Sequence, residues 1–506
     1  MTKSIKFRVT PALCTAMKKN GQDGADGIAE SAEKRVTRRR TWLFGFIVVS
    51  IVALALAVQS VTLRDPRLPT VAWEGGPAYW EQWPSTKPWA NPSFFPIGVW
   101  FESVTQQSDV DLDKAAGLNT YVELDSNSSA SLLRTNGMWS VTDIPLVGNG
   151  SENVGWLIAD EADMGYRSGY DRWSGIDGSD TCIPTQDAGG RCGYTVLATK
   201  KAYLPHNGEP FYANFGKGVM FWASTIRCAR NQPMPCHPPA NSEAGQFING
   251  GYTNWISDDN YWYTDNDLCA GGQGGVLMAG EGPVDASGRH SLTPAQCHRA
   301  SNYGLTVDKI RQLDAAGGKY QPVWAFVEVG HPSTGDTGRT ITGPQIQGAV
   351  MNSLIHGARG IIYFNHNFGG PCLSEHVLRD SCGAAVRPYV IAVNQQITAL
   401  ARVLNTQSSQ WTFNPKLDTM LKQTPDGTHY VFAMQKTGTS GAYTFTLPAG
   451  VDATSVTVLN ENRTVAISGG TFTDSFASEE IYHIYKIDAR NSPHNLLSSL
   501  MRAAGI

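Results

Sequence analysis

Two apolar stretches of this chain end in acidic residues. Residues 155–159 form an apolar run, too short to span a membrane, that is followed directly by Asp160 and Glu161. A second run at 322–327 leads straight into Glu328. Apolar runs of this length that end in acids are typical of buried barrel strands, which present polar side chains at their carboxyl ends. The pattern therefore predicts two such strands, each ending in a glutamate.

Strand-like and helix-like segments alternate from residue 93 to about 405, which indicates a parallel sheet. Helices are expected at 108–116, around 129–134, before Gly317, between Pro344 and Gly357, and at 393–404. Eight strands with intervening helices predict an α/β fold of the (β/α)8 TIM-barrel type over residues 93–405. The strands are expected at 94–100, 119–124, 141–147, 155–159, 209–215, 255–257, 322–328 and 361–364.

The pattern changes on both sides of this region. Residues 62–92 are rich in Trp and Pro without a clear period, and we expect them to wrap around the barrel. After residue 410, short β-rich segments separated by Gly, Asp and Asn predict a small antiparallel β-sandwich domain over 410–488. The tail at 489–506 is expected to be a surface helix or disordered.

The N-terminus has the pattern of a membrane anchor. Residues 1–41 carry ten Lys or Arg against four acids, a net charge of +6, and are expected to form a disordered cytoplasmic tail. Residues 42–61 contain no charge and are long enough to cross a bilayer as a transmembrane helix. Arg38, Arg39 and Arg40 before this run keep the N-terminus in the cytoplasm, which places the rest outside the cell. A cleaved signal peptide is the alternative, because small alanines at 53, 55 and 57 could supply its cleavage site.

The cysteines fit an exported chain. Cys14 lies in the N-terminal tail, and the other eight all follow the apolar run. An even number in an exported region indicates disulfides, and we favour pairing between neighbours. Two Cys-His pairs, 236–237 and 297–298, raise zinc as an alternative, but the chain has no C-x-x-C pair and we expect no metal site. The favoured disulfides are Cys182–Cys192, Cys228–Cys236, Cys269–Cys297 and Cys372–Cys382.

Composition narrows the class of partner. The formal charge is −4 and the pI about 6.3, without a long charged block outside the N-terminus, which argues against a nucleic-acid partner. Aromatic residues make up 10% of the chain, including 14 Trp, whereas charged residues make up 17%. Extracellular carbohydrate-active proteins often have this balance because sugar rings stack on aromatic side chains, although large cores also use Trp.

The two strand-end glutamates suit one reaction in particular. Glu161 and Glu328 would end the fourth and seventh strands and so open onto the same face of the barrel. Cleavage of a glycosidic bond needs one protonated and one charged carboxyl group, and different surroundings can separate their pKa values. Each candidate could instead be a solvated loop residue or a local hydrogen-bonding partner. The further candidates for substrate contact are Asp160, Asn214, Asp258, Tyr261, Trp324, His331, Asn365 and His366.

Four segments, at 95–100, 117–122, 156–161 and 324–328, give the chain a resemblance to the clan A retaining glycoside hydrolases. This resemblance implies a (β/α)8 barrel with Glu161 as acid/base and Glu328 as nucleophile. It also implies that Tyr261 lies near the nucleophile and that Asn214 contacts sugar. The chain departs from the clan at Asp160, where the clan usually has Asn.

The sequence thus predicts a membrane-anchored extracellular glycoside hydrolase that acts on a polysaccharide or cell-envelope glycan with retention and without a cofactor. A transglycosylase is a close alternative. A non-catalytic glycan-binding or envelope-assembly protein with a degenerate barrel is another. A metal-dependent hydrolase using Asp160, Glu161 and Asp163 lacks the histidines usual for zinc.

Overall fold

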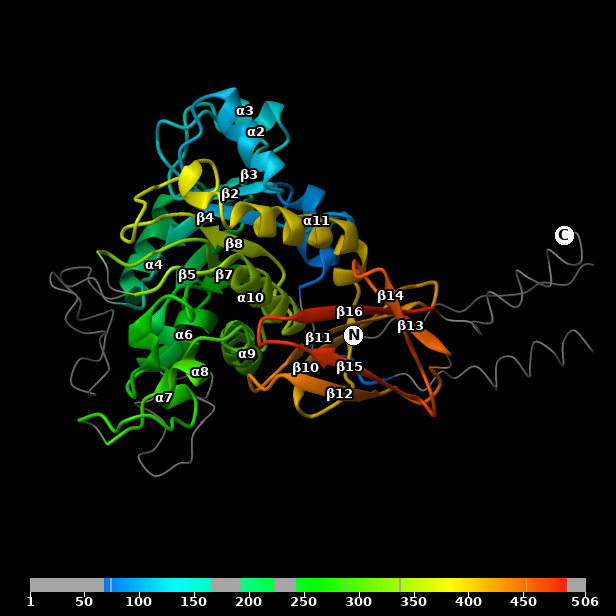
Figure 1. Ribbon diagram of the computed structural model, residues 1–506. Coiled ribbons are helices and arrows are strands. Elements are labelled where there is room, and N and C mark those ends of the chain that lie inside the picture. The colour runs from blue at the N-terminus through cyan, green and yellow to red at the C-terminus, as the bar shows by residue number, and fades with distance from the viewer. Residues whose placement is uncertain are drawn as a thin grey trace, which may run out of the picture. The chain divides into compact units, whose positions relative to one another are not determined.

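The computed structural model describes residues 68–72, 75–164, 193–222, 243–286, 288–335, 338–451 and 453–488. Eight parallel strands close into a barrel in chain order, as predicted (Figure 1). The third strand begins and ends earlier than expected, and the others lie within a few residues of their predicted positions. The strands are β1 (Ile97–Glu102), β2 (Thr120–Leu124), β3 (Trp139–Thr142), β4 (Asn153–Ala159), β5 (Phe211–Phe215), β6 (Trp255–Asp258), β7 (Val323–Glu328) and β8 (Ile361–Phe364).

Helices follow the strands and cover the outside of the barrel. In α10, Thr342 and Gln345 form a capping box at the start, with Pro344 in the first turn. Its predicted apolar face is buried against the strands, and Gly357, with φ of +92°, follows its end. The longer helices are α2 (Gln107–Ala115), α3 (Ala130–Thr135), α4 (Gly193–Tyr203), α6 (Glu243–Asn249), α9 (Ser301–Ala316), α10 (Gly343–Ile355) and α11 (Arg387–Leu404). Shorter ones are η4 (Gly218–Trp222), η5 (Asn266–Cys269), α7 (Gly274–Leu277), α8 (Pro294–Cys297) and η6 (Ser381–Gly383).

A cluster of tryptophans closes the amino end of the barrel. Two short helices before the barrel, η1 (Pro77–Gln82) and η2 (Lys87–Ala90), contribute Trp80 and Trp89. Trp80 lies 5.5 Å from Trp255, and Trp89 lies 5.6 Å from Trp324, between ring centroids. Because these partners stand at or near the first residues of β6 and β7, Trp324 is buried at the end opposite the strand-end acids. The structure therefore places Trp324 away from the strand ends where the predicted substrate contacts lie.

The C-terminal part forms two antiparallel sheets, which confirms the predicted β domain. A six-stranded sheet has the order β14-β13-β16-β11-β10-β9, and β12 pairs with β15. Phe445 stacks on Phe472 at 4.5 Å, and Tyr485 from the larger sheet packs against both rings. The sheets thus share one core. Their strands are β9 (Ser408–Ser409), β10 (Leu417–Gln423), β11 (His429–Gln435), β12 (Gly441–Thr446), β13 (Ser455–Val458), β14 (Arg463–Ala466), β15 (Thr471–Phe476) and β16 (Tyr482–Ile487).

The β domain is joined to the barrel helices through a histidine. His356, just after α10, lies 2.8 Å from Asp308 of α9 and 3.5 Å from Asp418 of β10. Asn352 of α10 donates a further hydrogen bond of 3.2 Å to Asp418. Burial alone would lower the pKa of His356, but the charges of the two aspartates outweigh it and raise the pKa to about 10. The imidazolium is therefore charged across the neutral range.

We expect this ion pair to stabilise the chain most at low and neutral pH. A histidine with a folded pKa of about 10 and an unfolded pKa of about 6.5 contributes fully below pH 6.5, and its contribution is lost as pH rises towards 10. His356→Gln should therefore lower the melting temperature at pH 6, by an amount equivalent to at most about 5 kcal/mol. The difference from the unchanged chain should shrink steadily up to pH 10. A difference that stays constant over this range would contradict the assignment.

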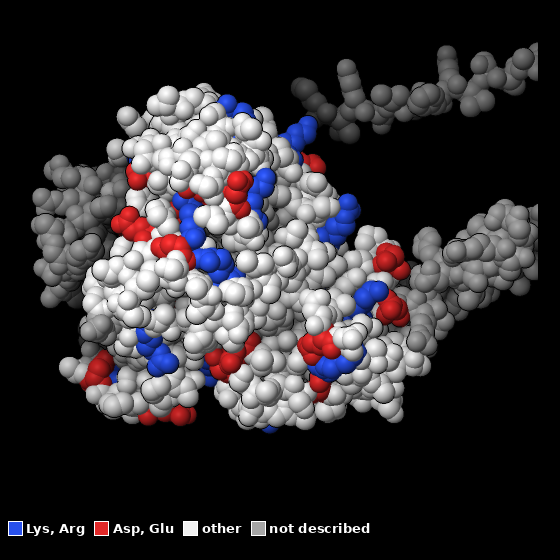
Figure 2. Space-filling view, turned by 45° about the horizontal axis from the view of Figure 1, so that its top comes forward, with Lys and Arg blue, Asp and Glu red and all other residues white. Residues whose placement is uncertain are grey.

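Two of the expected disulfides, Cys269–Cys297 and Cys372–Cys382, are formed. The other two expected pairs, at 182–192 and 228–236, lie outside the described residues, as do the predicted membrane span at 42–61 and both terminal tails. Among the residues that the structure does describe, none of the helices is long and apolar enough to span a bilayer. On the face shown in Figure 2, acidic and basic side chains of the described part are interspersed among broad uncharged areas.

Candidate active site

Carboxyl groups from several strands gather at the carboxyl end of the barrel. The acidic cluster, as we call it, consists of Glu123, Asp160, Glu161, Asp163 and Asp259. Glu123 is in β2, the next three follow β4, and Asp259 follows β6. Their charges raise one another's pKa values, which shows that they share one neighbourhood. Acids crowded in this way are a common feature of catalytic sites.

Glu161 stands at the centre of this cluster. Its backbone has φ of +47°, a left-handed conformation that costs a non-glycine residue roughly 1–2 kcal/mol. A Cβ at Gly216 would lie 3.1 Å from both Glu161 Oε1 and Asp259 Oδ1, so glycine at 216 leaves room for the two carboxyls to meet. Burial and the charge of Asp163 raise the pKa of Glu161, while a hydrogen bond with Asp259 lowers it.

Asp259 shares a proton with Glu161. Burial raises the pKa of Asp259 well above the usual range, and the charges of Glu161 and Asp160 raise it further. Because the pKa of Glu161 is raised as well, one hydrogen lies between the two carboxyl groups. The sharing of one proton between adjacent carboxyls is expected because two charges so close together in a buried site repel each other strongly.

Asp160 is supported from the barrel interior. Asn214 of β5 donates from Nδ2 to Asp160 at 2.9 Å, and its Oδ1 accepts from the Ser257 hydroxyl at 2.6 Å. Ser257 is bonded in turn to the Tyr212 hydroxyl. Asp160 is exposed to solvent at the barrel mouth. Partial desolvation by the surrounding protein and the charge of Glu161 raise its pKa.

Asp163 has a structural role. It is fully buried and accepts hydrogen bonds from the backbone N–H groups of Gly216, at 3.1 Å, and Val219, at 2.6 Å. These bonds fix the start of the segment that follows β5. Burial outweighs them and raises its pKa to about 6.

Glu328 ends β7 and is fully buried, with 0% of its surface exposed. The Tyr303 hydroxyl of α9 lies 2.7 Å from its Oε1 and 2.8 Å from its Oε2. Thr264 donates to Oε1 at 3.1 Å. Burial raises the pKa of Glu328 to about 7, although the hydroxyl donors favour its charged form.

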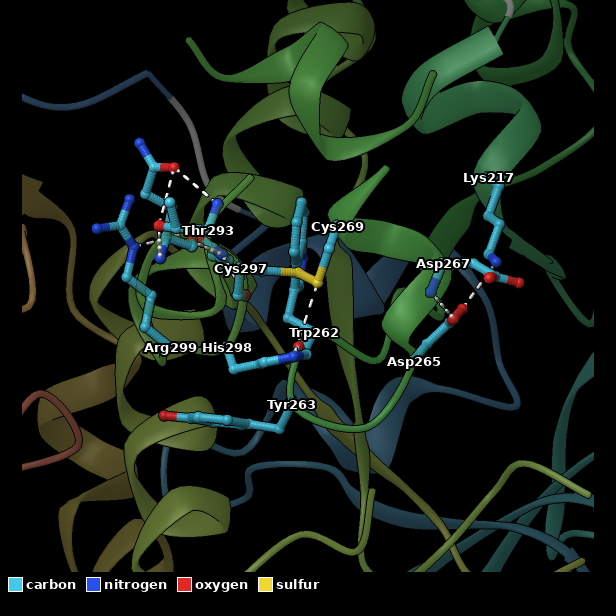
Figure 3. Close-up of a disulfide and its surroundings, with 12 residues drawn as sticks. Lys217, Trp262, Tyr263, Asp265, Asp267, Cys269, Thr293, Cys297, His298 and Arg299 are labelled. Atoms are coloured by element: carbon cyan, nitrogen blue, oxygen red, sulfur yellow. Dashed lines mark hydrogen bonds and ion pairs between the residues drawn. A yellow bond between two sulfur atoms is a disulfide. The ribbon is translucent and has the colours of Figure 1, made fainter. Parts of the chain in front are cut away.

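The loop after β6 carries several groups of the site and is held at two points (Figure 3). The Cys269–Cys297 disulfide joins the end of η5 to the end of α8. At its other side, Lys217 forms an ion pair of 2.7 Å with Asp265. The charge of Lys217 also lowers the pKa of Glu161. The loop thus positions Tyr261 and Thr264 on a constrained backbone.

Tyr261 is affected by the charges of both predicted catalytic glutamates. Burial raises the pKa of its hydroxyl well above the usual range, and the charges of Asp259, Glu161, Asp160 and Glu328 raise it further. The charges of Glu161 and Glu328 therefore both reach this hydroxyl. Its ring lies 6.3 Å from Phe326 and 5.2 Å from Phe364, between centroids.

Asp258 faces away from the site. In β6, Ile256 packs in the core shared with the helices, and Asp258 lines a small cavity of about 10 Å³ with Thr306 and Ile310 of α9. Burial raises its pKa well above the usual range, and the charges of Asp163 and Glu161 raise it further. Because side chains alternate along a strand, the following residue, Asp259, points to the mouth. The structure therefore places Asp259, and not the predicted Asp258, at the barrel mouth.

The predicted residues near β8 and after β7 are buried and bonded locally. Asn365 donates to Glu102, and its Oδ1 accepts from the Leu378 N–H at 2.7 Å. His366 is bonded through Nε2 to the Phe101 carbonyl at 3.0 Å, and His331 is bonded through Nδ1 to the Thr340 hydroxyl at 3.0 Å. These contacts fit the alternative in which all three hold loops in place.

Three acids of the cluster, Glu123, Asp163 and Asp259, were not among the candidates for catalysis or substrate contact. Asp259 adjoins the candidate Asp258, and the sequence does not distinguish which of these two acids points to the barrel mouth. Glu123 interrupts the apolar pattern of β2, which was the available signal. Its backbone has φ of +58°, and burial together with the charges of Asp160 and Asp143 raises its pKa to about 8.

Comparisons with known proteins give only distant matches. No family model and no curated protein matches the chain. Among solved structures, a family 39 glycoside hydrolase from Bacteroides cellulosilyticus superimposes with a TM-score of 0.43 and 11% identity, covering 78% of this chain and 82% of that one. An Anoxybacillus α-amylase gives 0.39 and 8%, covering 79% and 99%. An α-amylase from Geobacillus thermoleovorans complexed with acarbose gives 0.37 and 10%, covering 78% and 98%.

These likenesses are loose. What the chain's own strands and side chains define is a (β/α)8-barrel protein with a C-terminal β domain and an acidic cluster at the carboxyl end of the barrel.

Proposed function

We propose that the protein is a glycoside hydrolase that works by double displacement. The observation that carries the proposal is the environment of two strand-end glutamates around Tyr261. Glu161 has a raised pKa and shares a proton with Asp259, and Glu328 is held by two hydroxyl donors. A proton donor and a carboxylate supported by donors are the two groups that glycosidic cleavage needs.

The roles follow from these surroundings. Glu161 transfers its proton to the leaving oxygen as the bond from that oxygen to the anomeric carbon breaks, while a Glu328 oxygen forms a bond to the same carbon. In the second step Glu161 accepts a proton from water, and the water oxygen displaces Glu328 from the anomeric carbon. Two displacements at one carbon retain its configuration.

The burial of Glu328 sets a requirement on this mechanism. Its carboxylate has no exposed surface, and Tyr303 and Thr264 occupy its hydrogen-bonding positions. Substrate binding must therefore move the groups that cover it. The second acid that faces Glu161 is Asp259, which makes it the alternative partner if Glu328 is not reached.

The proposed function includes a cellular location for the enzyme. We propose that residues 42–61 anchor it in a membrane and that the barrel acts outside the cell on a polysaccharide or cell-envelope glycan. The disulfides Cys269–Cys297 and Cys372–Cys382 support an oxidising compartment. No cofactor enters the proposed reaction.

The proposal is tested by incubating the full chain with polysaccharides and following released sugar by proton NMR. We expect hydrolysis of at least one substrate, with the first product having the anomeric configuration of the bond that was cut. Release of the opposite anomer would overturn double displacement. Transfer to sugar acceptors instead of water would identify a transglycosylase, and binding without turnover would favour the non-catalytic alternative.

A further prediction concerns Tyr303. Tyr303→Phe removes the hydroxyl nearest to both Glu328 oxygens, and the loss of this donor raises the pKa of Glu328. Because Glu328 must be charged to attack, the acidic limb of the kcat/KM profile should move to higher pH, and kcat/KM should fall about 10-fold to 100-fold. Tyr263→Phe is the matched control, since the Tyr263 hydroxyl bonds to Glu479. Equal pH profiles for the two variants would contradict the assignment.

A further inference from the structure

Aromatic side chains form an exposed surface beside the acidic cluster. Phe101, at the end of β1, is 40% exposed, and Phe368, after β8, is 45% exposed. The buried His366 ring lies between them, 5.8 Å from Phe101 and 5.5 Å from Phe368 between centroids. We call the two exposed rings, Phe101 and Phe368, the aromatic platform. Exposed apolar surface of this kind is a frequent mark of a ligand-binding groove.

The backbone at Phe101 is held in an unfavourable conformation. Phe101 has φ of +50°, which is rare for a bulky residue. Among the described residues, three of the six non-glycine residues with positive φ stand at the carboxyl ends of barrel strands, and the other two of these are Glu123 and Glu161. Such strain is found mainly at binding and catalytic sites, where the surrounding structure maintains it. In β1 it leaves Phe101 exposed between buried neighbours.

The aromatic platform is continuous with the candidate active site. Phe364, at the end of β8, lies 5.2 Å from His366 and 5.9 Å from Phe368. The same Phe364 ring lies 5.2 Å from Tyr261, whose hydroxyl feels the charges of both glutamates. A row of rings therefore leads from the acidic cluster across β8 to the edge of β1.

Polar groups lie beside the aromatic platform. Glu375 is exposed, and the side chain of His376 is 38% exposed while its Nδ1 contacts Glu102 at 2.5 Å. Both residues are close enough that their charges act on the pKa of His366. The Cys372–Cys382 disulfide holds the loop that carries them. The surface thus combines flat apolar faces with hydrogen-bonding groups.

We propose that the aromatic platform binds a sugar ring of the substrate, next to the ring whose bond is cut. A pyranose has one face of C–H groups, which packs on aromatic rings, and a rim of hydroxyls, which suits groups such as Glu375 and His376. The proposal rests on the proposed function for its substrate class. It adds a binding position on the side of β1 and β8.

Binding of defined oligosaccharides tests the proposal. The probes are cellohexaose, xylohexaose, maltohexaose and chitohexaose, titrated by calorimetry into the full chain with the Glu161→Gln change to prevent turnover. At least one should bind, and Phe101→Ala and Phe368→Ala should each weaken its Kd about 10-fold. Tyr320→Ala is the matched control, since Tyr320 is 38% exposed with φ of +55° but precedes β7 at the opposite end of the barrel.

Two more variants separate binding from folding. Phe101→Gly removes the ring and suits the left-handed backbone, so it should keep the melting temperature while binding weakly. Phe101→Trp should restore binding. Unchanged affinity in the Phe101 and Phe368 variants, or no binding of any of the four probes at millimolar concentration, would overturn the proposal.

The outcomes also distinguish this proposal from the proposed function. If the unchanged chain hydrolyses a probe but the Phe variants bind it normally, the proposed hydrolase function is supported and the aromatic platform is contradicted. If the Phe variants lose binding but no probe is hydrolysed, the aromatic platform is supported and the hydrolase function is contradicted.

Discussion

Replacing Glu161 by Gln is expected to lower kcat by about 10²–10⁴-fold on substrates with a sugar leaving group, which is the range for loss of a general acid. Gln keeps the size of the side chain but cannot supply the proton. The alkaline limb of the pH profile should disappear as well, because activity of the unchanged enzyme falls as pH rises through the raised pKa of Glu161. Steady-state kinetics between pH 4 and 10 would measure both effects.

The leaving group offers a sharper test of the same assignment. In a 2,4-dinitrophenyl glycoside the leaving group is 2,4-dinitrophenolate, which departs without protonation. The first step catalysed by the Glu161→Gln variant should therefore be nearly normal on this substrate. Added azide should then accelerate turnover by replacing the water that Glu161 no longer activates. Glu81→Gln, an exposed glutamate before the barrel, is the matched control and should have no effect. Equal losses on activated and natural substrates would exclude Glu161 as the acid.

Glu328→Gln should have the larger effect, roughly 10⁴–10⁶-fold in kcat, because no covalent intermediate can form without the carboxylate. The fold should survive, since the amide oxygen can still accept from Tyr303 and Thr264, and an uncharged group is easier to bury. Activity against an activated glycoside and the melting temperature should be measured together. A variant that remains folded but inactive supports the role of nucleophile.

Because Glu328 is buried, Asp259→Asn tests whether Asp259 is the second catalytic carboxyl instead. Asp259 shares a proton with Glu161, so the loss of its carboxyl should shift the pH profile and reduce kcat by less than the loss of Glu328. If Asp259→Asn abolishes turnover and Glu328→Gln retains it, the second catalytic carboxyl is Asp259. In that case the buried Glu328 serves to fix Tyr303 and the start of α9.

The barrel could be predicted because its signals are local. Each strand is a short apolar run bounded by turn residues, and the regular alternation with helices indicates parallel pairing. The ends of β4 and β7 were visible for the same reason, since each apolar run meets an acid directly. Glu161 and Glu328 could therefore be placed at the same end of the barrel from sequence.

The depth and direction of individual side chains could not be predicted as well. Alternation gives the face on which Trp324 lies, but its height in the barrel depends on which residues begin β7 and on the Trp89 ring beneath it. Asp258 and Asp259 are adjacent acids, and a shift of one residue along the strand turns a side chain from the barrel axis towards the surrounding helices. The left-handed backbones of Glu123 and Glu161 leave no mark in the sequence.

Contacts between distant segments explain the remaining differences. Asn365 is bonded to Glu102, 263 residues away in the chain, and His366 to the carbonyl of Phe101, 265 residues away. The sequence could suggest that these two side chains lie near the barrel mouth. Their hydrogen-bond partners belong to β1, and no sequence pattern indicates that β1 contacts the loop after β8.

The tryptophan cluster at the amino end of the barrel has a consequence for orientation. Trp80 and Trp89 bring the N-terminal part of the described chain to the side opposite the acidic cluster. Because indole rings occupy the amino ends of the strands, a substrate approaches the barrel from the side of the acidic cluster.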